Sequence, residues 1–205
     1  MGHVSTGIRR ILEHPFVYEA LQTAVGHKVA RRMVIDEYVN PEKNAMILDI
    51  GCGPGKMLEI LSDVEYVGVD FNESYIKSAR ELYVGKGNFL VGNATSIDLP
   101  EDEQFDIILA YNLMHHMEDE EVSELLDSSK KFLKKGGKLI SMDPCLVSDA
   151  TLFARMLIKF ARGTSIRTAE GYSNLAINRF EKIESHVRYD LLNFTYPHCI
   201  LSCIK

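Results

Sequence analysis

A short apolar run that ends in three alternating glycines is the feature that most constrains how this chain can fold. Residues 46–55 read MILDIGCGPG, and the first five place apolar side chains on both faces of an extended strand. This pattern is typical of a parallel strand covered on both sides, and the glycines after it let backbone approach a ligand where a Cβ atom would clash. A helix is predicted over about residues 56–62, with free N–H groups at its N-terminus pointing at that ligand. We therefore expect a ligand site at the carboxyl end of this strand.

Glycine spacing and a following acid narrow the choice of ligand. Gly51, Gly53 and Gly55 are each two apart, so the third glycine of the dinucleotide fingerprint G-x-G-x-x-G is missing. A second predicted strand, residues 66–70, ends in Asp70, 19 positions after Gly51. An acid at this point can accept both ribose hydroxyls, and NAD or S-adenosylmethionine would use it in the same way. Asp70 alone therefore does not discriminate between the two cofactors.

The pattern Asp49-x-Gly51-x-Gly53-x-Gly55 resembles the S-adenosylmethionine loop of class I methyltransferases. From residue 46 to residue 205 the chain is similar, in order, to the broad family of small-molecule methyltransferases that includes the ubiquinone-pathway enzymes. The resemblance implies an α/β, doubly wound, Rossmann-like fold: a seven-stranded, mostly parallel sheet with a C-terminal antiparallel hairpin strand and helices on both faces. We predict a single domain over 1–205, with a helical cap (1–44), a cofactor-binding core (45–143), a helical lid insertion (144–182) and closing strands (183–205).

The resemblance also implies where the cofactor binds. Asn93-Ala94 stands where the family pattern has Asp-Ala, so the acceptor for the adenine amino group is a neutral side chain here, with a hydrogen bond about half as strong as a charged one. Phe71 is expected against the adenine ring. The expected cofactor-binding residues are Asp49, Gly51, Cys52, Gly53, Gly55, Asp70, Phe71, Asn93, Ala94, Ala110 and Arg31.

Arg31 enters this set because the cofactor's methionine carboxylate needs a positive partner. The densest group of basic residues near the glycine loop is at positions 27–32, on a predicted helix. At about 100° per residue, Arg31 and Arg32 lie at the two edges of its apolar face, from which a guanidinium can reach across and bind both carboxylate oxygens. We predict that one of them clamps the carboxylate; the alternative is two solvated arginines.

A second loop is expected to face the methyl acceptor. The predicted fourth strand, residues 105–110, is followed by Tyr111 and then by His115 and His116, and this stretch is similar to the family's strand-then-L-h-H signature. Either histidine could take a proton from the acceptor, because imidazole titrates near neutral pH. The alternative is that a histidine packs under the next helix and caps backbone groups. The predicted substrate-side residues are Tyr111, Asp143 and Tyr172.

The rest of the chain is predicted to form further helices and the last strands of the sheet. Two helices are predicted over residues 15–39, with a break near Gly26. Another helix begins at the acidic run 118–121 and ends in lysines at 130–135, and the strand 138–142 follows it. Helices over 150–161 and 168–180 would form a lid over the substrate, with ordinary core packing as an equal alternative. The strands 183–191 and 198–204 close the sheet.

Composition limits the partners. The chain has 205 residues, 46% hydrophobic and 25% charged, with a formal charge of −6, which argues against nucleic acid as a partner. Its four cysteines form no C-x-x-C pair, so no metal is expected, and no stretch predicts a signal peptide or membrane insertion. We expect a cytoplasmic protein and leave a homodimer open.

The sequence thus predicts an enzyme that transfers a methyl group from S-adenosyl-L-methionine to a small molecule and releases S-adenosyl-L-homocysteine. Two alternatives stay open: an NAD-binding oxidoreductase, and a non-catalytic S-adenosylmethionine-binding protein. Whether the acceptor atom is oxygen, nitrogen or carbon is not readable from the residues.

Overall fold

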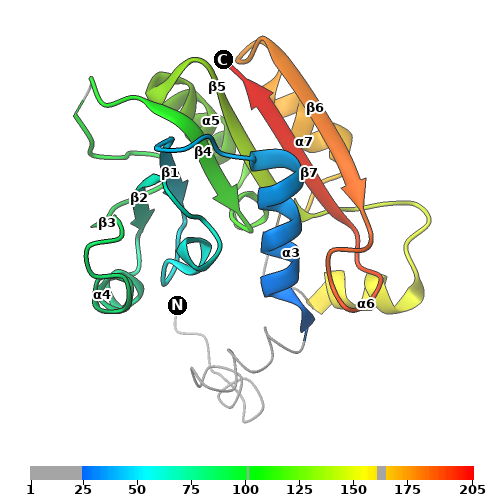
Figure 1. Ribbon diagram of the computed structural model, residues 1–205. Helices are drawn as coiled ribbons and strands as arrows, with labels where there is room; N and C mark the ends of the chain where they lie inside the picture. Colours follow the sequence, from blue (N-terminus) through cyan, green and yellow to red (C-terminus); the bar gives the residue numbers. More distant parts are fainter. Residues whose placement is uncertain (1–24, 101, 161–164) are drawn as a thin grey trace, which may run out of the picture.

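The structure is a computed structural model that describes residues 25–100, 102–160 and 165–205. Seven strands form one sheet in the order β3-β2-β1-β4-β5-β7-β6, and β7 runs antiparallel to both of its neighbours (Figure 1). The strands are β1 (Met46–Ile50), β2 (Glu65–Asp70), β3 (Asn88–Val91), β4 (Phe105–Tyr111), β5 (Leu133–Pro144), β6 (Lys182–Arg188) and β7 (His198–Ile204). This is the seven-stranded, mostly parallel sheet with an antiparallel closing strand that the sequence predicted.

The alternation of apolar residues in β1 divides them between two cores. Ile47 belongs to one buried cluster, and Leu48 and Ile50 belong to the other, and all three side chains are fully buried. Burying such an aliphatic side chain stabilises the fold by roughly 1.5–3 kcal/mol. The strand is therefore held at the centre of the sheet, and its carboxyl end is fixed against both layers.

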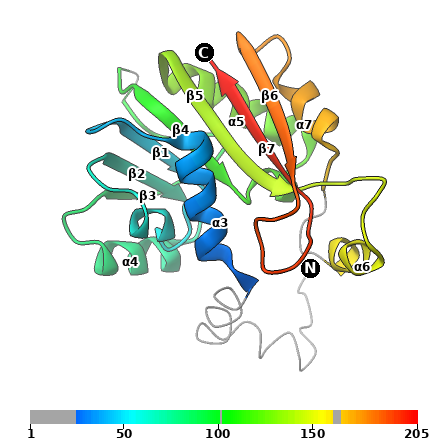
Figure 2. The ribbon, with the colours of Figure 1, turned by 45° about the vertical axis from the view of Figure 1, so that its right-hand side comes forward.

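Helices cover both faces of the sheet (Figures 1 and 2). On one face lie α3 (His27–Val34), which continues into the π-helical turn η1 (Ile35–Val39), and α4 (Glu73–Leu82). On the other face lie α5 (Asp119–Phe132) and α7 (Ala169–Ala176). Helix α6 (Leu152–Phe160) lies beyond the carboxyl ends of the parallel strands, where ligands of open α/β sheets bind (Figure 1).

Two predicted helices are wrong in extent. The helix expected over 56–62 is only the 3-10 turn η2 (Lys56–Glu59), whose N-cap Gly55 has left-handed backbone and whose Met57 side chain is buried. The helix expected to run to residue 135 ends at Phe132, because Leu133 pairs with Phe105 and begins β5. Burial of Leu133 and its pairing in the sheet prevail over the helical preference of the lysines.

Several other boundaries also differ from the predictions. Tyr111 is the last residue of β4 and not part of a loop, β6 ends at Arg188, and α7 stops at Ala176. The helix predicted after the break at Gly26 is present as α3, and Gly26 has a φ of 95°. The preceding part of the predicted cap, residues 1–24, lies outside the described residues.

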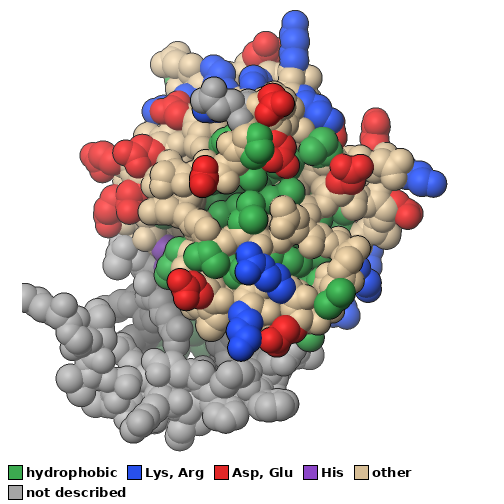
Figure 3. Space-filling model, turned by 90° about the vertical axis from the view of Figure 1, so that its left-hand side faces the viewer, with side chains coloured by type: hydrophobic (Ala, Val, Ile, Leu, Met, Phe, Trp, Pro, Cys, Tyr) green, Lys and Arg blue, Asp and Glu red, His purple; other side chains and the backbone are tan. Residues whose placement is uncertain are grey.

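The surface on the side of β3 and α4 is mixed in character. Figure 3 shows acidic, basic and apolar side chains interspersed on this face. Its exposed apolar residues include Leu82, Val84 and Val91. Within the described ranges, no helix is both long and apolar enough to cross a membrane.

Candidate functional site

The glycine loop after β1 has left-handed backbone that favours glycine. Gly51 has a φ of 75°, and a Cβ atom there would lie 3.0 Å from the Leu113 side chain. Gly53 has a φ of 54°, and a Cβ atom there would meet nothing within 4 Å. Gly51 therefore permits close packing against the loop after β4, whereas Gly53 shapes the backbone on an open side that a ligand can approach.

The N–H groups of this loop are largely used within the chain. Four of them donate to protein oxygens: Gly51 and Cys52 to the Val69 carbonyl (2.8 and 3.1 Å), Gly53 to Asp70 Oδ2 (2.8 Å) and Gly55 to the Cys52 carbonyl (3.0 Å). The loop is followed by a 3-10 turn of four residues and not by the longer helix whose N-terminus was expected to face the ligand. A phosphate group needs free N–H groups of this kind, so the loop is poorly suited to a pyrophosphate.

Asp70 is held in a fixed orientation at the end of β2. Its side chain is buried, Oδ1 accepts the Asn72 N–H group and Oδ2 accepts the Gly53 N–H group, each at 2.8 Å. Each carboxylate oxygen keeps a further lone pair for a ligand hydroxyl. The next residue, Phe71, is 79% exposed, so its ring is available to lie against a flat ligand group.

Asp49 carries a buried carboxyl group with one unpaired oxygen. Tyr66 donates its hydroxyl to Asp49 Oδ2 at 2.5 Å, whereas Asp49 Oδ1 has no partner among the described residues. Burial raises the pKa of Asp49 to about 7, and the nearby charge of Arg31 opposes this rise. An unpaired buried oxygen of this kind costs about 1–3 kcal/mol, which a ligand donor would recover.

The structure separates the two candidate arginines. Arg31 Nε is buried and lacks a hydrogen-bond partner within the described part of the chain, and its charge acts on Asp49 and on Tyr111. The Tyr111 hydroxyl is also buried without a described partner. Arg32, by contrast, has a side chain 54% exposed and an Nη1 atom 3.8 Å from Asp36 Oδ1. Arg31 therefore faces the glycine-loop side of the sheet, and Arg32 faces solvent.

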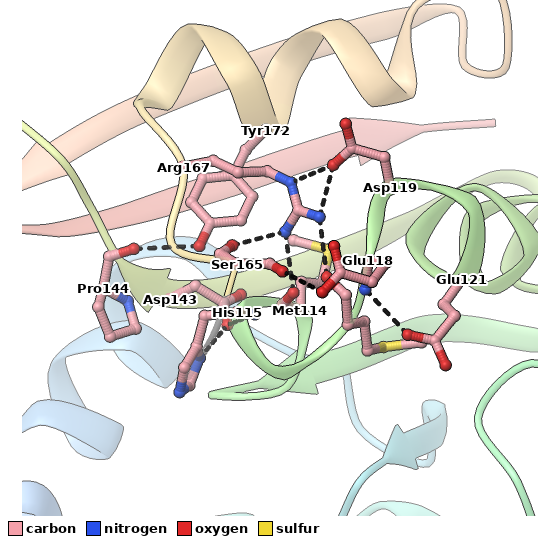
Figure 4. Close-up of polar contacts among 11 residues, drawn as sticks. Met114, His115, Glu118, Asp119, Glu121, Asp143, Pro144, Ser165, Arg167 and Tyr172 are labelled. Carbon is pink, nitrogen blue, oxygen red and sulfur yellow. Dashed lines mark hydrogen bonds and ion pairs between the residues drawn. The ribbon is translucent and has the colours of Figure 1, made fainter. Parts of the chain in front are cut away.

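His115 and Asp143 meet at the carboxyl ends of β4 and β5 (Figure 4). His115 is buried, its Nδ1 lies 2.8 Å from Asp143 Oδ1, and its backbone N–H group donates to the same oxygen at 3.1 Å. If Nδ1 donates its proton to Asp143, Nε2 is left as the basic atom of the ring. The His116 ring is exposed, and its centroid lies 3.9 Å from that of His115. His115 thus has a carboxylate partner that can orient a general base.

Some predicted site residues have roles inside the protein. Ala110 is fully buried in β4. Asn93 Oδ1 accepts the N–H group and the hydroxyl of Thr95, at 3.2 and 3.3 Å, so the oxygen expected to meet adenine already has two donors. Tyr172 is 1% exposed and donates its hydroxyl to the Pro144 carbonyl at 3.1 Å. Tyr172 therefore fits the core-packing alternative better than a substrate contact.

Sequence reasoning missed Arg167, a residue whose contacts surround the His115 loop. It follows a chain segment with no strong periodicity, and an isolated arginine gives no sequence signal of its partners. In the structure its side chain is 10% exposed, and it bonds to residues about 50 positions earlier in the chain. Only the tertiary fold brings these groups together.

Comparisons with known proteins agree with this geometry. Residues 47–137 match the family model described as a methyltransferase domain. Phosphoethanolamine N-methyltransferase 1 of Zea mays is 32% identical over 104 residues, which cover 48% of this chain and 21% of that protein. A ubiquinone biosynthesis O-methyltransferase of Nitrobacter winogradskyi is 35% identical over 97 residues, which cover 45% of this chain and 36% of that protein.

The fold is also that of a solved methyltransferase. The structure of a SAM-dependent methyltransferase from Methanosarcina mazei has a TM-score of 0.66 and 21% sequence identity, and the match covers 83% of this chain and 96% of that one. In sequence pattern over residues 47–137 and in fold, the chain is similar to class I S-adenosylmethionine-dependent methyltransferases. It spans 21% and 36% of the lengths of the two curated relatives above, whose named activities differ in the atom that is methylated.

Proposed function

We propose that this protein transfers a methyl group from S-adenosyl-L-methionine to a small-molecule acceptor. The main support for the proposal is the contrast between polar groups around the glycine loop that already have hydrogen-bond partners and polar groups that have none among the described residues. The N–H groups that would bind a pyrophosphate are donated within the chain, whereas Asp49 Oδ1 and Arg31 Nε are buried and lack described partners. An unpaired carboxylate oxygen and an unpaired guanidinium nitrogen suit an ammonium and a carboxylate, the two charged groups of an amino acid.

The residues present fit the remainder of the cofactor. Asp70 would accept the ribose hydroxyls, because each of its oxygens retains a lone pair and its orientation is fixed by backbone donors. The exposed Phe71 ring would lie against adenine. Arg31 would hold the methionine carboxylate, and Asp49 would face the ammonium group. Ala94, together with the neutral Asn93, would border the adenine less strongly than the Asp-Ala of the family pattern.

When bound, S-adenosylmethionine supplies a methyl group that is already activated by its sulfonium. The chain then has to hold the acceptor in line with that group and keep water away, and positioning of this kind supplies most of the rate. His115 would take the acceptor's proton on Nε2 while Asp143 accepts the hydrogen bond from Nδ1. Tyr111, at the end of β4, would line the acceptor side.

Two alternatives make different predictions. An NAD-binding oxidoreductase would share Asp70, but it would need free N–H groups in the glycine loop, and four of these are already donated. A non-catalytic S-adenosylmethionine-binding protein would share the cofactor residues and would not need the buried pair of His115 and Asp143. Substitution of His115 or Asp143 is therefore the best test between a methyltransferase and a non-catalytic S-adenosylmethionine-binding protein.

Calorimetric titration of the full chain with S-adenosyl-L-homocysteine and, separately, with NADH tests the cofactor. We expect binding of the first and none of the second; the reverse result would overturn the proposal. Transfer of a labelled methyl group to a panel of phenols, hydroxy acids and amines then tests catalysis. His115→Gln should abolish or strongly lower transfer while leaving S-adenosyl-L-homocysteine binding intact, and equal transfer by this variant would refute the role of His115.

The acceptor side of the proposal includes α6. This helix lies at the ligand edge of the sheet, and the exposed side chains of Leu152, Phe153 and Met156 fit a lid, which stays a prediction. The small-molecule acceptor is part of the proposal and is consistent with the names of the relatives. The cytoplasmic location and the open question of a homodimer remain expectations from the sequence.

A further inference from the structure

Arg167 lies just before α7 and spreads its guanidinium over several acceptors (Figure 4). Its Nη1 donates to the carbonyls of Met114 and Ser165, at 3.0 and 2.8 Å, and its Nη2 donates to the carbonyl of Met117 at 2.8 Å. Its Nε lies 2.8 Å and its Nη2 lies 2.6 Å from Asp119 Oδ1 at the start of α5. These contacts use the whole planar set of donors that distinguishes arginine from lysine.

The two carbonyls from Met114 and Met117 stand on either side of the histidines. Met114 is the first residue of the 3-10 turn η3 (Met114–His116), and Met117 is its C-cap. Both of these residues are buried, so water would not readily replace the guanidinium. The Met114 carbonyl also accepts the Met117 N–H group at 3.2 Å, so the Met117 carbonyl depends more strongly on Arg167. Arg167 therefore donates to a carbonyl at each end of this turn and holds both ends in place.

The neighbouring Ser165 holds the same turn from another direction. Its N–H group donates to the carbonyl of His115 at 3.1 Å, and its hydroxyl donates to Glu118 Oε1 at 2.9 Å. On the opposite side, Asp143 binds both the backbone N–H group and Nδ1 of His115. His115 is thus held between Asp143 of β5 and the segment that contains Ser165 and Arg167.

We propose that Arg167 is a positioning residue that sets the alignment of the His115 ring on Asp143. This inference rests on the proposed function, in which that ring takes the acceptor's proton. In the hydrogen bonds and ion pairs of the described residues, Arg167 meets neither the ring nor the cofactor residues; it acts through the backbone on both sides of the histidine. The Arg167 charge is balanced by Asp119, so its main effect is geometric.

A purely structural arginine would give a different result. Arg179 provides the matched control, because it lies just after α7, pairs with Asp127 of α5 at 2.9 Å and donates to the Leu175 carbonyl at 2.9 Å. It joins the same two helices and contacts no part of the His115 turn in any hydrogen bond of the described residues. Loss of either arginine can lower stability, but only loss of Arg167 should change His115.

The experiment compares the full chain with its Arg167→Met, Arg167→Lys and Arg179→Met variants by imidazole nitrogen NMR. His115→Gln identifies the His115 signals. We expect Arg167→Met to shift the His115 ring signals and to weaken the Nδ1–H signature of the bond to Asp143. Arg167→Lys keeps the charge without the planar fork. Its His115 signals should therefore lie between those of the unchanged chain and those of Arg167→Met. Arg179→Met should leave the His115 signals as they are in the unchanged chain.

Two further measurements separate this inference from the proposed function. S-adenosyl-L-homocysteine affinity should stay within about twofold in all three variants, and methyl transfer should fall about tenfold or more in Arg167→Met alone. Unchanged His115 signals in folded Arg167→Met overturn the inference; if that variant does not fold, unchanged signals in Arg167→Lys do so. If the unchanged chain fails to bind S-adenosyl-L-homocysteine, the proposed function fails, and the His115 signals still decide the role of Arg167.

Discussion

Replacing Arg31 with methionine tests the cofactor site most sharply, because the adjacent Arg32 is a built-in control. Arg31 Nε is buried without a described partner, whereas the Arg32 side chain is 54% exposed beside Asp36. A charge-assisted hydrogen bond to a carboxylate contributes about 1.5–3 kcal/mol, so Arg31→Met should weaken S-adenosyl-L-homocysteine binding by about tenfold to a hundredfold. An exposed ion pair contributes about 0–1 kcal/mol, so Arg32→Met should change binding by less than about fivefold.

Calorimetric titration of both variants measures this difference. Methionine keeps an apolar stem on the helix surface, so thermal unfolding of each variant should show that α3 is still packed. Because the Arg31 charge opposes the raised pKa of Asp49, some loss of stability is expected in Arg31→Met at alkaline pH. Equal affinities for the two variants, or a larger loss in Arg32→Met, would refute the assignment of Arg31 to the methionine carboxylate.

Three further predictions concern single carboxylate or hydroxyl groups. Asp70→Ala should lose two charge-assisted hydrogen bonds of about 1.5–3 kcal/mol each and weaken S-adenosyl-L-homocysteine binding by more than about tenfold; an unchanged dissociation constant in the folded variant would contradict this. Because burial raises the pKa of Asp49 from 3.8 to about 7, the folded state binds a proton more tightly, and stability should fall as the pH rises between these values. Chemical unfolding at several pH values should show that this fall is absent in Asp49→Asn, and a parallel fall in both proteins would refute it. Tyr172→Phe leaves the Pro144 carbonyl without its donor, so the free energy of unfolding should fall by about 1 kcal/mol and the melting temperature by about 2–4 °C. Cofactor affinity should stay unchanged, and a weaker affinity would place Tyr172 in the site after all.

The helix and strand boundaries show where local patterns lose to tertiary pairing. Residues 130–135 continue a helical charge pattern, yet Leu133 leaves the helix because its side chain is fully buried and its backbone pairs with Phe105. Lys134, freed from the helix, instead places its Nζ atom 2.9 Å from both oxygens of Asp106. A partner far away in sequence decides the boundary, and no window around the lysines contains that information.

The sequence by itself determined the central strand, the glycine loop and the acid that ends the second strand. Each of these depends on residues that are close together in the chain: apolar alternation over 46–50, glycines two apart, and a carboxylate at the tip of the next strand. Local spacing is enough for such features because the backbone alone places neighbouring residues. The family pattern then supplied the seven-stranded, mostly parallel sheet with its antiparallel closing strand and the nature of the cofactor.

Only the tertiary structure decided which polar groups are free and which are already paired. Helical periodicity puts Arg31 and Arg32 at equivalent edges, and the packing of α3 on the sheet buries the Nε atom of Arg31 and leaves Arg32 exposed. Likewise the loop N–H groups are used because β2 brings Val69 and Asp70 beside them. Arg167 reaches the His115 turn only because α7 packs against α5. Hydrogen-bond saturation depends on distances between segments remote in sequence, so it is a property of the folded chain and not of any local pattern.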